Sequence, residues 1–424
     1  MLKDTLLLFN EWWETKEISK GKAKEYKRRC YSKIKKIFKD YKQILILTGL
    51  RRVGKTTIMF QLIEDLLRKK VNPKHIFYFS FDELVRDPIT LLKTYSEITN
   101  VNWKKENIYV FFDEIQKLPR WGPKIKILYD NFPNMKLVLS GSASIALQEE
   151  AIKNLAGRYF SEKIQVLSLQ EFSELKLRRE IPSFDIYKEK ISKLYKEYIH
   201  KPFPELVAWE DIIEIKRYIK ELVVDRIFID IPETFSSANP SLLSTLTNIF
   251  MNDVGMILDA TSLSKQLGIH KATLQKHIHY LEFGNLINIV KNYRPSIRSE
   301  SRKMKKIYPA HISLAFAHYA EPNIGRINES LVQSSLQLDK YWRDSFKREV
   351  DFIKLEKGKL VPIEVKTKET INKNEVSSLI YFMKKFKIKK GYVIYQGEEK
   401  NIKLNGMEII LKPIEKVLFG FSLT

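Results

Sequence analysis

Residues 43–57 read QILILTGLRRVGKTT, an apolar run that leads into two spaced glycines and then into Lys-Thr-Thr. Gly49 and Gly54 can adopt the positive φ angles that turn successive backbone N–H groups toward phosphate oxygens. The helix expected after Gly54 adds its positive end to the same point. The stretch therefore predicts a phosphate-binding loop between a buried strand and a helix, formed by Gly49, Leu50, Arg51, Arg52, Val53, Gly54, Lys55, Thr56 and Thr57.

Two side chains of this loop suit a nucleoside triphosphate. Lys55 is expected to reach the β- and γ-phosphates, and the Thr56 hydroxyl to ligate Mg2+. The metal needs a carboxylate as well, and IYVFFDE at 108–114 ends an apolar run in two acids. We expect Asp113 to bind Mg2+ and Glu114 to orient or deprotonate the attacking water. The alternative is a solvated strand end that happens to carry two acids.

Two further polar residues are candidates for catalysis. KLVLSGS at 136–142 places Ser140 and Ser142 at a strand end, and we favour Ser140 as the residue that senses the γ-phosphate; a simple Ser-Gly-Ser turn is the alternative. Arg158, in NLAGRYF, could neutralise charge that develops on the γ-phosphate, in cis or in trans. A surface arginine is the simpler interpretation of Arg158.

Short apolar runs alternate with helical stretches after residue 43, at 76–82, 108–114, 136–142 and 163–169. Each run is continuous, as in strands buried on both faces of a parallel sheet. The predicted fold class is α/β: a parallel-sheet P-loop NTPase of the additional-strand type, followed by a helical lid, a winged helix and a C-terminal α/β nuclease-like domain. The predicted boundaries are 1–42 (basic helical segment), 43–170 (ATPase core), 171–239 (lid), 240–310 (winged helix) and 311–424 (nuclease-like domain).

The composition of the chain indicates which kinds of partner to consider. The formal charge of +23 makes nucleic acid, DNA in particular, the first partner to consider, with a lysine-rich surface that serves solubility as the alternative. Cys30 is the single cysteine, and no run of about 18 apolar residues exists to cross a membrane. We therefore expect a cytoplasmic protein with no membrane partner. The sequence leaves the oligomeric state open, and a homo-oligomer is one alternative.

The segment at 241–310 carries ten Lys/Arg against four Asp/Glu, and it contains TSLSKQLGIHKATLQKHIHYLEFGNLI. A short helix, a turn at Gly268 and a longer helix match a helix-turn-helix, and the following basic stretch matches a wing. The side chains expected near a major groove are His270, Lys271, Thr273, Gln275 and Lys276. An interdomain spacer of the same fold is the alternative.

Acids and a lysine recur near the C-terminus, in RINESLVQSSL and REVDFIKLEKGKLVPIEVKTK. Alternation in a strand puts Glu364 and Lys366 on one sheet face, with Asp351 one hairpin earlier and Glu329 on a preceding helix. This looks like the PD-(D/E)xK nuclease pattern, in which acids hold a second divalent metal and the lysine activates water. A charged strand can produce the short motif by chance, and the same frame can serve binding alone.

The strings LTGLRRVGKTT, FFDEIQKLPRW, LSGSASIAL and LAGRYFSEKIQVLSLQEF resemble, in order and spacing, archaeal and bacterial AAA-like ATPases with a C-terminal nuclease-like domain. The resemblance runs from about residue 9 to the C-terminus and implies that the nucleotide is ATP. Two stretches depart from the family pattern. KPFPE at 201–205 replaces a Gly-Gly-x-Pro turn, and YPAHISL places His311 where an acid is expected.

Three functional hypotheses follow from these patterns. The first is an ATP-driven conformational switch that acts on or near nucleic acid. The second is a metal-dependent DNA nuclease gated by the ATPase. The third is a DNA-binding or scaffold protein whose assembly depends on its nucleotide state.

Overall fold

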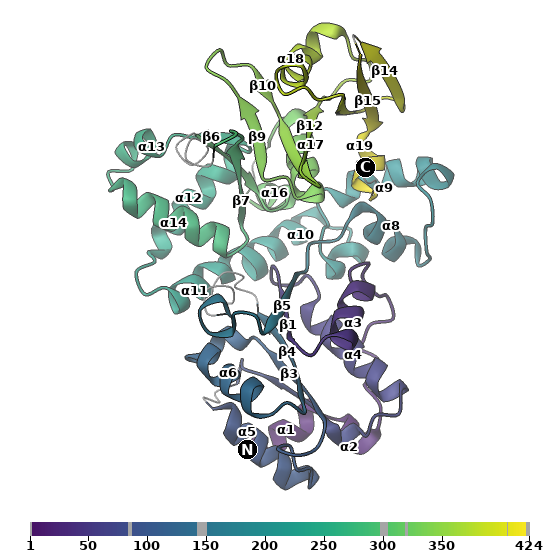
Figure 1. Ribbon diagram of the computed structural model, residues 1–424, viewed down its shortest axis with the longest axis vertical. Coiled ribbons are helices and arrows are strands. Elements are labelled where there is room, and N and C mark those ends of the chain that lie inside the picture. The colour runs from purple at the N-terminus through teal and green to yellow at the C-terminus, as the bar shows by residue number, and fades with distance from the viewer. Residues whose placement is uncertain are drawn as a thin grey trace. The chain divides into compact units, whose positions relative to one another are not determined.

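The structure is a computed structural model that describes residues 2–83, 87–141, 151–296, 304–318, 321–404 and 406–420 (Figure 1). The chain divides into two compact units, Met1–Gln165 and Val166–Thr424. Ser142, one of the polar residues considered above, lies outside the described residues, as does most of the predicted wing.

The first unit is built on one sheet of five parallel strands in the order β2-β3-β4-β1-β5. Strand β4 lies between β1 and β3, the strands that precede the phosphate loop and the acid pair, as the additional-strand prediction requires. Figure 1 shows α6 on one side of the sheet and α3 and α4 on the other. The elements are β1 (Ile44–Thr48), α4 (Lys55–Arg68), β2 (Ile76–Ser80), α5 (Pro88–Thr99), β3 (Ile108–Asp113), α6 (Trp121–Asn131), β4 (Met135–Gly141) and β5 (Tyr159–Lys163).

The prediction of the fifth strand was wrong. We expected it at 163–169, but β5 covers Tyr159–Lys163. It is an edge strand with partly exposed side chains, so it lacks the apolar run that identified the other strands. The apolar residues that suggested the later position, Ile164 and Leu167, are buried just beyond the end of β5.

The N-terminal segment packs against the sheet and against α4. Three helices form in this segment, which the sequence predicted to be basic and helical: α1 (Leu2–Phe9), α2 (Trp12–Thr15) and α3 (Tyr31–Asp40). The apolar stripe of α3, formed by Tyr31, Ile34 and Phe38, is buried. This stripe is therefore a packing face.

Strand β2 is the outer strand of the sheet, and the N-terminal segment covers its free edge. The Asn10 side chain donates to the Tyr78 carbonyl at 2.9 Å and accepts from the Tyr78 N–H at 2.7 Å, as a neighbouring strand would. The indole N–H groups of Trp12 and Trp13 both donate to the Ile76 carbonyl. These four hydrogen bonds satisfy backbone groups that an open edge leaves exposed.

The second unit begins with helices, as predicted for residues 171–239. The residues Ile-Pro-Glu at 231–233 do not end the helix, because α11 continues to Thr234 with Pro232 inside it. Pro232 has no N–H, so it removes one hydrogen bond from this helix. The helices are α8 (Leu169–Leu177), α9 (Lys188–Tyr198), α10 (Ile212–Tyr218), a π-helical segment (Ile219–Val224) and α11 (Asp225–Thr234).

A second sheet follows, in the order β10-β9-β7-β8-β6. Strands β6 and β7 both pair antiparallel with β8, and β7 pairs parallel with β9, so this sheet continues into strands of the C-terminal part. The elements are α12 (Pro240–Asn252), β6 (Met256–Leu258), α13 (Ala260–Gln266), α14 (Lys271–Phe283), β7 (Ile287–Asn292), β8 (Lys305–Pro309), β9 (Lys340–Arg343) and β10 (Glu349–Val350).

The third sheet has the order β11-β12-β13-β15-β14 and begins with the predicted hairpin, in which Phe352 pairs with Ile363. Its core is formed by Trp342, Phe382 and Val393 with their neighbours. The remaining elements are α16 (Ile312–Ala317), α17 (Ile324–Leu336), β11 (Phe352–Glu356), β12 (Lys359–Val365), α18 (Ser377–Lys385), β13 (Lys390–Tyr395), β14 (Lys400–Leu404), β15 (Met407–Pro413) and α19 (Ile414–Leu418).

His311, which replaces the acid of the family pattern, caps helix α16. Its Nδ1 accepts from the Ser313 backbone N–H at 3.2 Å, which is the contact that an aspartate makes at the same helix position. The ring is fully buried and contacts Tyr198. Burial, followed by the neighbouring His200, lowers the pKa of His311 to about 3, so the folded protein keeps this ring neutral.

The buried ring predicts a loss of stability at mildly acidic pH. An unfolded histidine titrates near ~6.5, so the unfolded chain binds more protons than the folded one below that pH. Stability should therefore fall as the pH drops from ~6.5 toward ~3, by about 2 kcal/mol from His311 at a pH of about 5. Urea unfolding at neutral pH and at a pH of about 5 measures this loss of stability.

His311→Asn is the matched variant, because asparagine also caps helices but takes up no proton. The variant should lose less stability than the parent between neutral pH and a pH of about 5. His200, whose pKa burial lowers to about 4, contributes equally to both proteins. An equal loss in parent and variant would show that His311 is not the source.

Candidate functional site

The predicted phosphate loop joins the end of β1 to the start of α4. Gly49 has φ +142° and Gly54 has φ +96°, both in the region that favours glycine. A Cβ at Gly49 would collide with the Ile164 carbonyl, so a side chain there would require the loop to move. Arg52 is also left-handed, with φ +68°. The local backbone therefore matches the turn that the two glycines predicted.

Lys55 closes the loop from inside. Its Nζ donates to the carbonyls of Gly49 at 3.1 Å and Leu50 at 2.9 Å, and the side chain is buried. Arg28, from the N-terminal segment, donates to the Val53 carbonyl at 2.9 Å. The loop is thus held on its carbonyl side by two cationic side chains, one of which the motif itself supplies. The sequence pattern gave no sign of Arg28, because it precedes the loop by more than twenty residues.

Asp113 is the centre of the site. Its Oδ2 accepts from the Thr56 hydroxyl at 2.6 Å and from the Tyr78 hydroxyl at 3.0 Å, and its Oδ1 accepts from the Ser140 hydroxyl. Strands β2, β3 and β4 and helix α4 therefore each supply one member of the group. The carboxyl ends of parallel strands meet at one edge of the sheet, which is why residues so far apart in sequence converge here.

Burial, and then the negative charge of Glu114, raises the pKa of the Asp113 carboxyl. Burial and Asp113 likewise raise the pKa of the Tyr78 hydroxyl, so Tyr78 stays a neutral donor. Two negative charges side by side in a buried site favour a cation between them and the loop. The oxygen pair of Thr56 and Asp113, already in contact, fits the hard-oxygen ligands that Mg2+ prefers.

Glu114 begins a 3-10 turn (Ile115–Lys117) with φ +50°. Gln116 donates from its Nε2 to Glu114 Oε2 and fixes the orientation of that carboxylate. Sequence reasoning missed both Tyr78 and Gln116. A tyrosine inside a predicted buried strand needs a hydrogen-bond partner, and that requirement was the available signal for Tyr78.

Arg158 does not join this group. It precedes β5, and its backbone carbonyl accepts from the Ile44 N–H at 2.8 Å, at the amino-terminal edge of the sheet. The phosphate loop follows the opposite, carboxyl-terminal end of β1. The Arg158 side chain pairs with Asp130, with Nε 2.7 Å from Oδ1. A role for Arg158 on the γ-phosphate of its own subunit therefore lacks support from this geometry.

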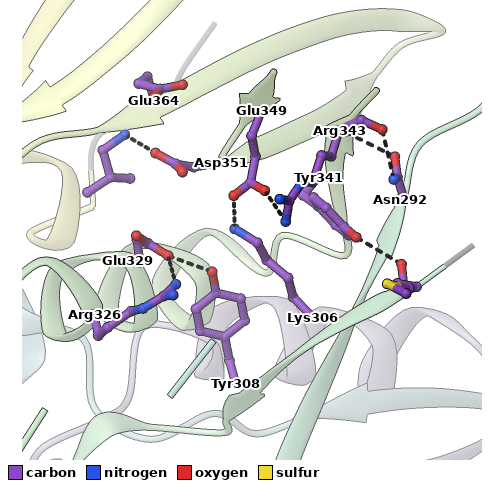
Figure 2. A network of polar contacts seen from close by, with 12 residues as sticks. Asn292, Lys306, Tyr308, Arg326, Glu329, Tyr341, Arg343, Glu349, Asp351 and Glu364 are labelled. Atoms are coloured by element: carbon purple, nitrogen blue, oxygen red, sulfur yellow. Dashed lines mark hydrogen bonds and ion pairs between the residues drawn. The ribbon is translucent and has the colours of Figure 1, made fainter. Parts of the chain in front are cut away.

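The C-terminal candidates do converge (Figure 2). Glu329 lies on α17, where it accepts from Tyr308 at 2.8 Å and Arg326 at 3.2 Å. Asp351 precedes β11 and accepts from the Val365 N–H at 2.8 Å. Glu364 on β12 pairs with Lys366 at 2.7 Å, while its buried Oε2 accepts no hydrogen bond.

The charges in this group affect one another. Burial, and then Glu329, raises the pKa of Asp351; burial, and then Asp351, raises the pKa of Glu364. Burial alone would lower the pKa of Lys366, but Glu364 and Asp351 outweigh it and the net shift is upward. Among the residues that the structure describes, no three His, Cys, Asp or Glu side chains lie close enough to hold a metal ion. The group therefore does not fit the second divalent metal that the sequence suggested.

Helix α14 has the two faces that the helix-turn-helix prediction requires. Leu274, Ile278 and Leu281 are buried, and the exposed candidates are His270, Lys271, Gln275 and Lys276, with Thr273 half-buried. His277 is buried too: its Nε2 accepts from the Asn239 N–H at 3.0 Å.

No helix within the described ranges is long and apolar enough to cross a membrane.

Residues 41–173 match the AAA domain family, and two domains of unknown function match 192–322 (DUF8612) and 327–415 (DUF4143). The uncharacterized protein MJ1637 of Methanocaldococcus jannaschii is 30% identical over 325 residues, which cover 70% of this chain and 68% of that protein. An uncharacterized protein of Haemophilus influenzae is 23% identical over 390 residues, covering 88% of this chain and 94% of that one.

A solved structure of a signal-transduction ATPase with numerous domains (STAND), with a tetratricopeptide repeat sensor, from Pyrococcus horikoshii is 11% identical. It aligns with a TM-score of 0.28 over 72% of this chain and 45% of that one. The chain thus spans about half the length of that structure.

Proposed function

Because the chain belongs to the family of its Methanocaldococcus jannaschii relative, and residues 41–173 match the AAA domain family, we propose that it binds ATP with Mg2+ and uses hydrolysis as a conformational switch. The observation that carries the proposal is the convergence of Lys55, Thr56 and Asp113 at the carboxyl edge of one parallel sheet. A cationic loop beside a buried carboxylate is the arrangement that a triphosphate and its metal require.

Each residue of the site has a role in this proposal. The backbone N–H groups of residues 49–57 and the Lys55 ammonium bind the phosphates, and Thr56 and Asp113 hold Mg2+, which offsets phosphate charge when bound. Glu114, held by Gln116, orients the attacking water. Ser140 senses the γ-phosphate. Arg158 could neutralise charge on the γ-phosphate only of a nucleotide that is bound to a second copy of the chain.

The hydroxyl network around Asp113 supports a route for the switch. The Thr56 hydroxyl donates its hydrogen to Asp113, and its oxygen lone pairs can ligate a metal at the same time, so a cation bound there changes the charge that surrounds Asp113. Tyr78 and Ser140 share the same carboxylate, so strands β2 and β4 both experience that change. A change at one helix start is thereby passed to two strands of the sheet.

DNA is the partner that we propose for the second unit. The element order α12-β6-α13-α14-β7-β8, with β6 and β7 antiparallel to β8, supports a winged helix over 240–310. Its exposed α14 residues and its net positive charge suit contacts with phosphates. We further propose that residues 171–239 act as a helical lid. We also propose that the protein is cytoplasmic.

The test is ATP hydrolysis by the full chain with Mg2+, with and without duplex DNA. We expect hydrolysis that requires Mg2+ and rises at least severalfold with DNA, and DNA affinity that falls steeply with salt. A rate independent of Mg2+ would contradict the ATPase site. Mg2+-dependent hydrolysis with a salt-independent DNA affinity would leave the ATPase in place and remove DNA as the partner.

We keep a metal-dependent DNA nuclease as the alternative to be tested, although the acids beside Asp351 form no group that could hold a metal ion among the residues that the structure describes. The same preparations can be assayed for cleavage of DNA with Mn2+. Cleavage that disappears in Asp351→Ala while ATP hydrolysis persists would support this activity. Cleavage that survives both Asp351→Ala and Lys366→Ala would assign it to a contaminant.

A further inference from the structure

Four carboxylates gather beside strand β8 in the second unit: Glu329, Glu349, Asp351 and Glu364 (Figure 2). We call them the acid cluster. They come from α17, β10, the start of the β11–β12 hairpin and β12, so the fold brings them together from well-separated positions. Burial and mutual repulsion make such a group unstable unless cations compensate it.

One buried lysine on strand β8 reaches into the acid cluster. Lys306 lies on β8, and its side chain is only 2% exposed. Its Nζ lies 2.5 Å from Glu349 Oε1. Tyr308, two positions along β8 and thus on the same face, donates to Glu329 at 2.8 Å. Strand β8 therefore supplies both a charge and a hydroxyl to the cluster.

We infer that Lys306 is the resident cation of the acid cluster and takes the charge position that a divalent metal would otherwise occupy. The negative charges of three of the four acids, Asp351, Glu349 and Glu329, favour the charged form of Lys306. Burial alone would lower the pKa of Lys306, but these acids outweigh it, so the side chain stays an ammonium. An ammonium that is fixed among these acids repels a divalent cation that approaches the same carboxylates.

The other cations near the acid cluster are not buried enough to compensate it in this way. Lys366 is 28% exposed and pairs with Glu364. Arg326 is 37% exposed and pairs with Glu329 on its own helix, and Arg343 is 31% exposed and pairs with Glu349. All three remain in contact with water, which screens their charge. Lys306 is the deeply buried one of the four, so its removal takes away the compensating charge that water does not screen.

Lys306→Met tests the inference, because methionine keeps an unbranched apolar side chain and removes the charge. Lys305→Met is the matched control: Lys305 is the neighbouring residue of β8, and alternation points it to the opposite face. We expect Lys306→Met to lower the thermal midpoint by about 10 °C, as loss of one partner from a buried ion pair does. Lys305→Met should change it little.

Mn2+ then distinguishes the inference from a general packing effect. The parent should bind no Mn2+ that depends on Asp351, whereas Lys306→Met should gain one such ion and recover part of its lost midpoint. Lys306→Met combined with Asp351→Asn should lose the gained ion. Binding is read by electron paramagnetic resonance on nucleotide-free protein.

Two results would overturn the inference. One is a parent protein that binds Mn2+ at a site lost in Asp351→Asn, because Lys306 would then not exclude the metal. The other is a folded Lys306→Met protein that gains no Mn2+ and no midpoint shift with Mn2+. If Lys306→Met does not fold, Lys306→Met with Glu349→Gln removes the paired charges together and is measured in the same way.

Discussion

Lys55→Ala is expected to abolish measurable ATP hydrolysis, with a fall of at least about a hundredfold in kcat. Lys55 is the buried ammonium of the phosphate loop, and it donates to two loop carbonyls. Alanine removes the charge that meets the β- and γ-phosphates and also the contacts that hold the loop closed. Phosphate release under saturating ATP and Mg2+ measures the loss.

Lys69→Ala is the control for this variant. Lys69 follows the last residue of the same helix and is exposed, so its loss should leave the rate within about twofold of the parent, as for other surface changes. Circular dichroism would show that both variants fold. A Lys55→Ala protein that hydrolyses ATP at the parental rate would place the nucleotide site elsewhere.

Glu114→Gln should separate ATP binding from hydrolysis. The amide keeps the size of the carboxylate but cannot accept a proton from water, so kcat should fall by about 10²–10⁴ while ATP stays bound. Loss of the negative charge also removes one cause of the raised Asp113 pKa, which favours metal binding by Asp113. The expected product is a protein that retains ATP through gel filtration.

Glu83→Gln is the matched control, since Glu83 is an exposed carboxylate shortly after β2. It should hydrolyse ATP like the parent. Glu114→Gln that turns over ATP at the rate of Glu83→Gln would exclude Glu114 as the residue that orients water. A variant that neither binds nor hydrolyses would instead assign Glu114 to the metal.

Local sequence predicted the residues that meet at the core of the candidate site. Gly49, Gly54, Lys55 and Thr56 stand in one short motif, and Asp113 ends a buried apolar run, so each could be assigned from its neighbours alone. Their convergence follows from parallel strands whose ends share one edge. Alternation likewise brought Glu364 and Lys366 together correctly, and the hairpin brought Asp351 beside them.

The residues that sequence reasoning missed act over long separations. Arg28, Tyr78 and Lys306 each take their meaning from a partner on another element, and nothing in their own neighbourhoods marks them. Strand β5 was misplaced for another reason: its side chains are exposed or only partly buried, so it lacks the apolar run that identified the other strands. Side chains that act through tertiary contact need the fold before they can be assigned.

The cover over the outer edge of β2 limits how copies of this protein can associate. Filaments of many β proteins grow when an unpaired strand of one molecule docks onto that of the next. Here Asn10 occupies both hydrogen-bonding groups of Tyr78. Growth by strand addition is consequently blocked on that flank, and association through this first sheet has to use its side-chain surfaces or the β5 flank.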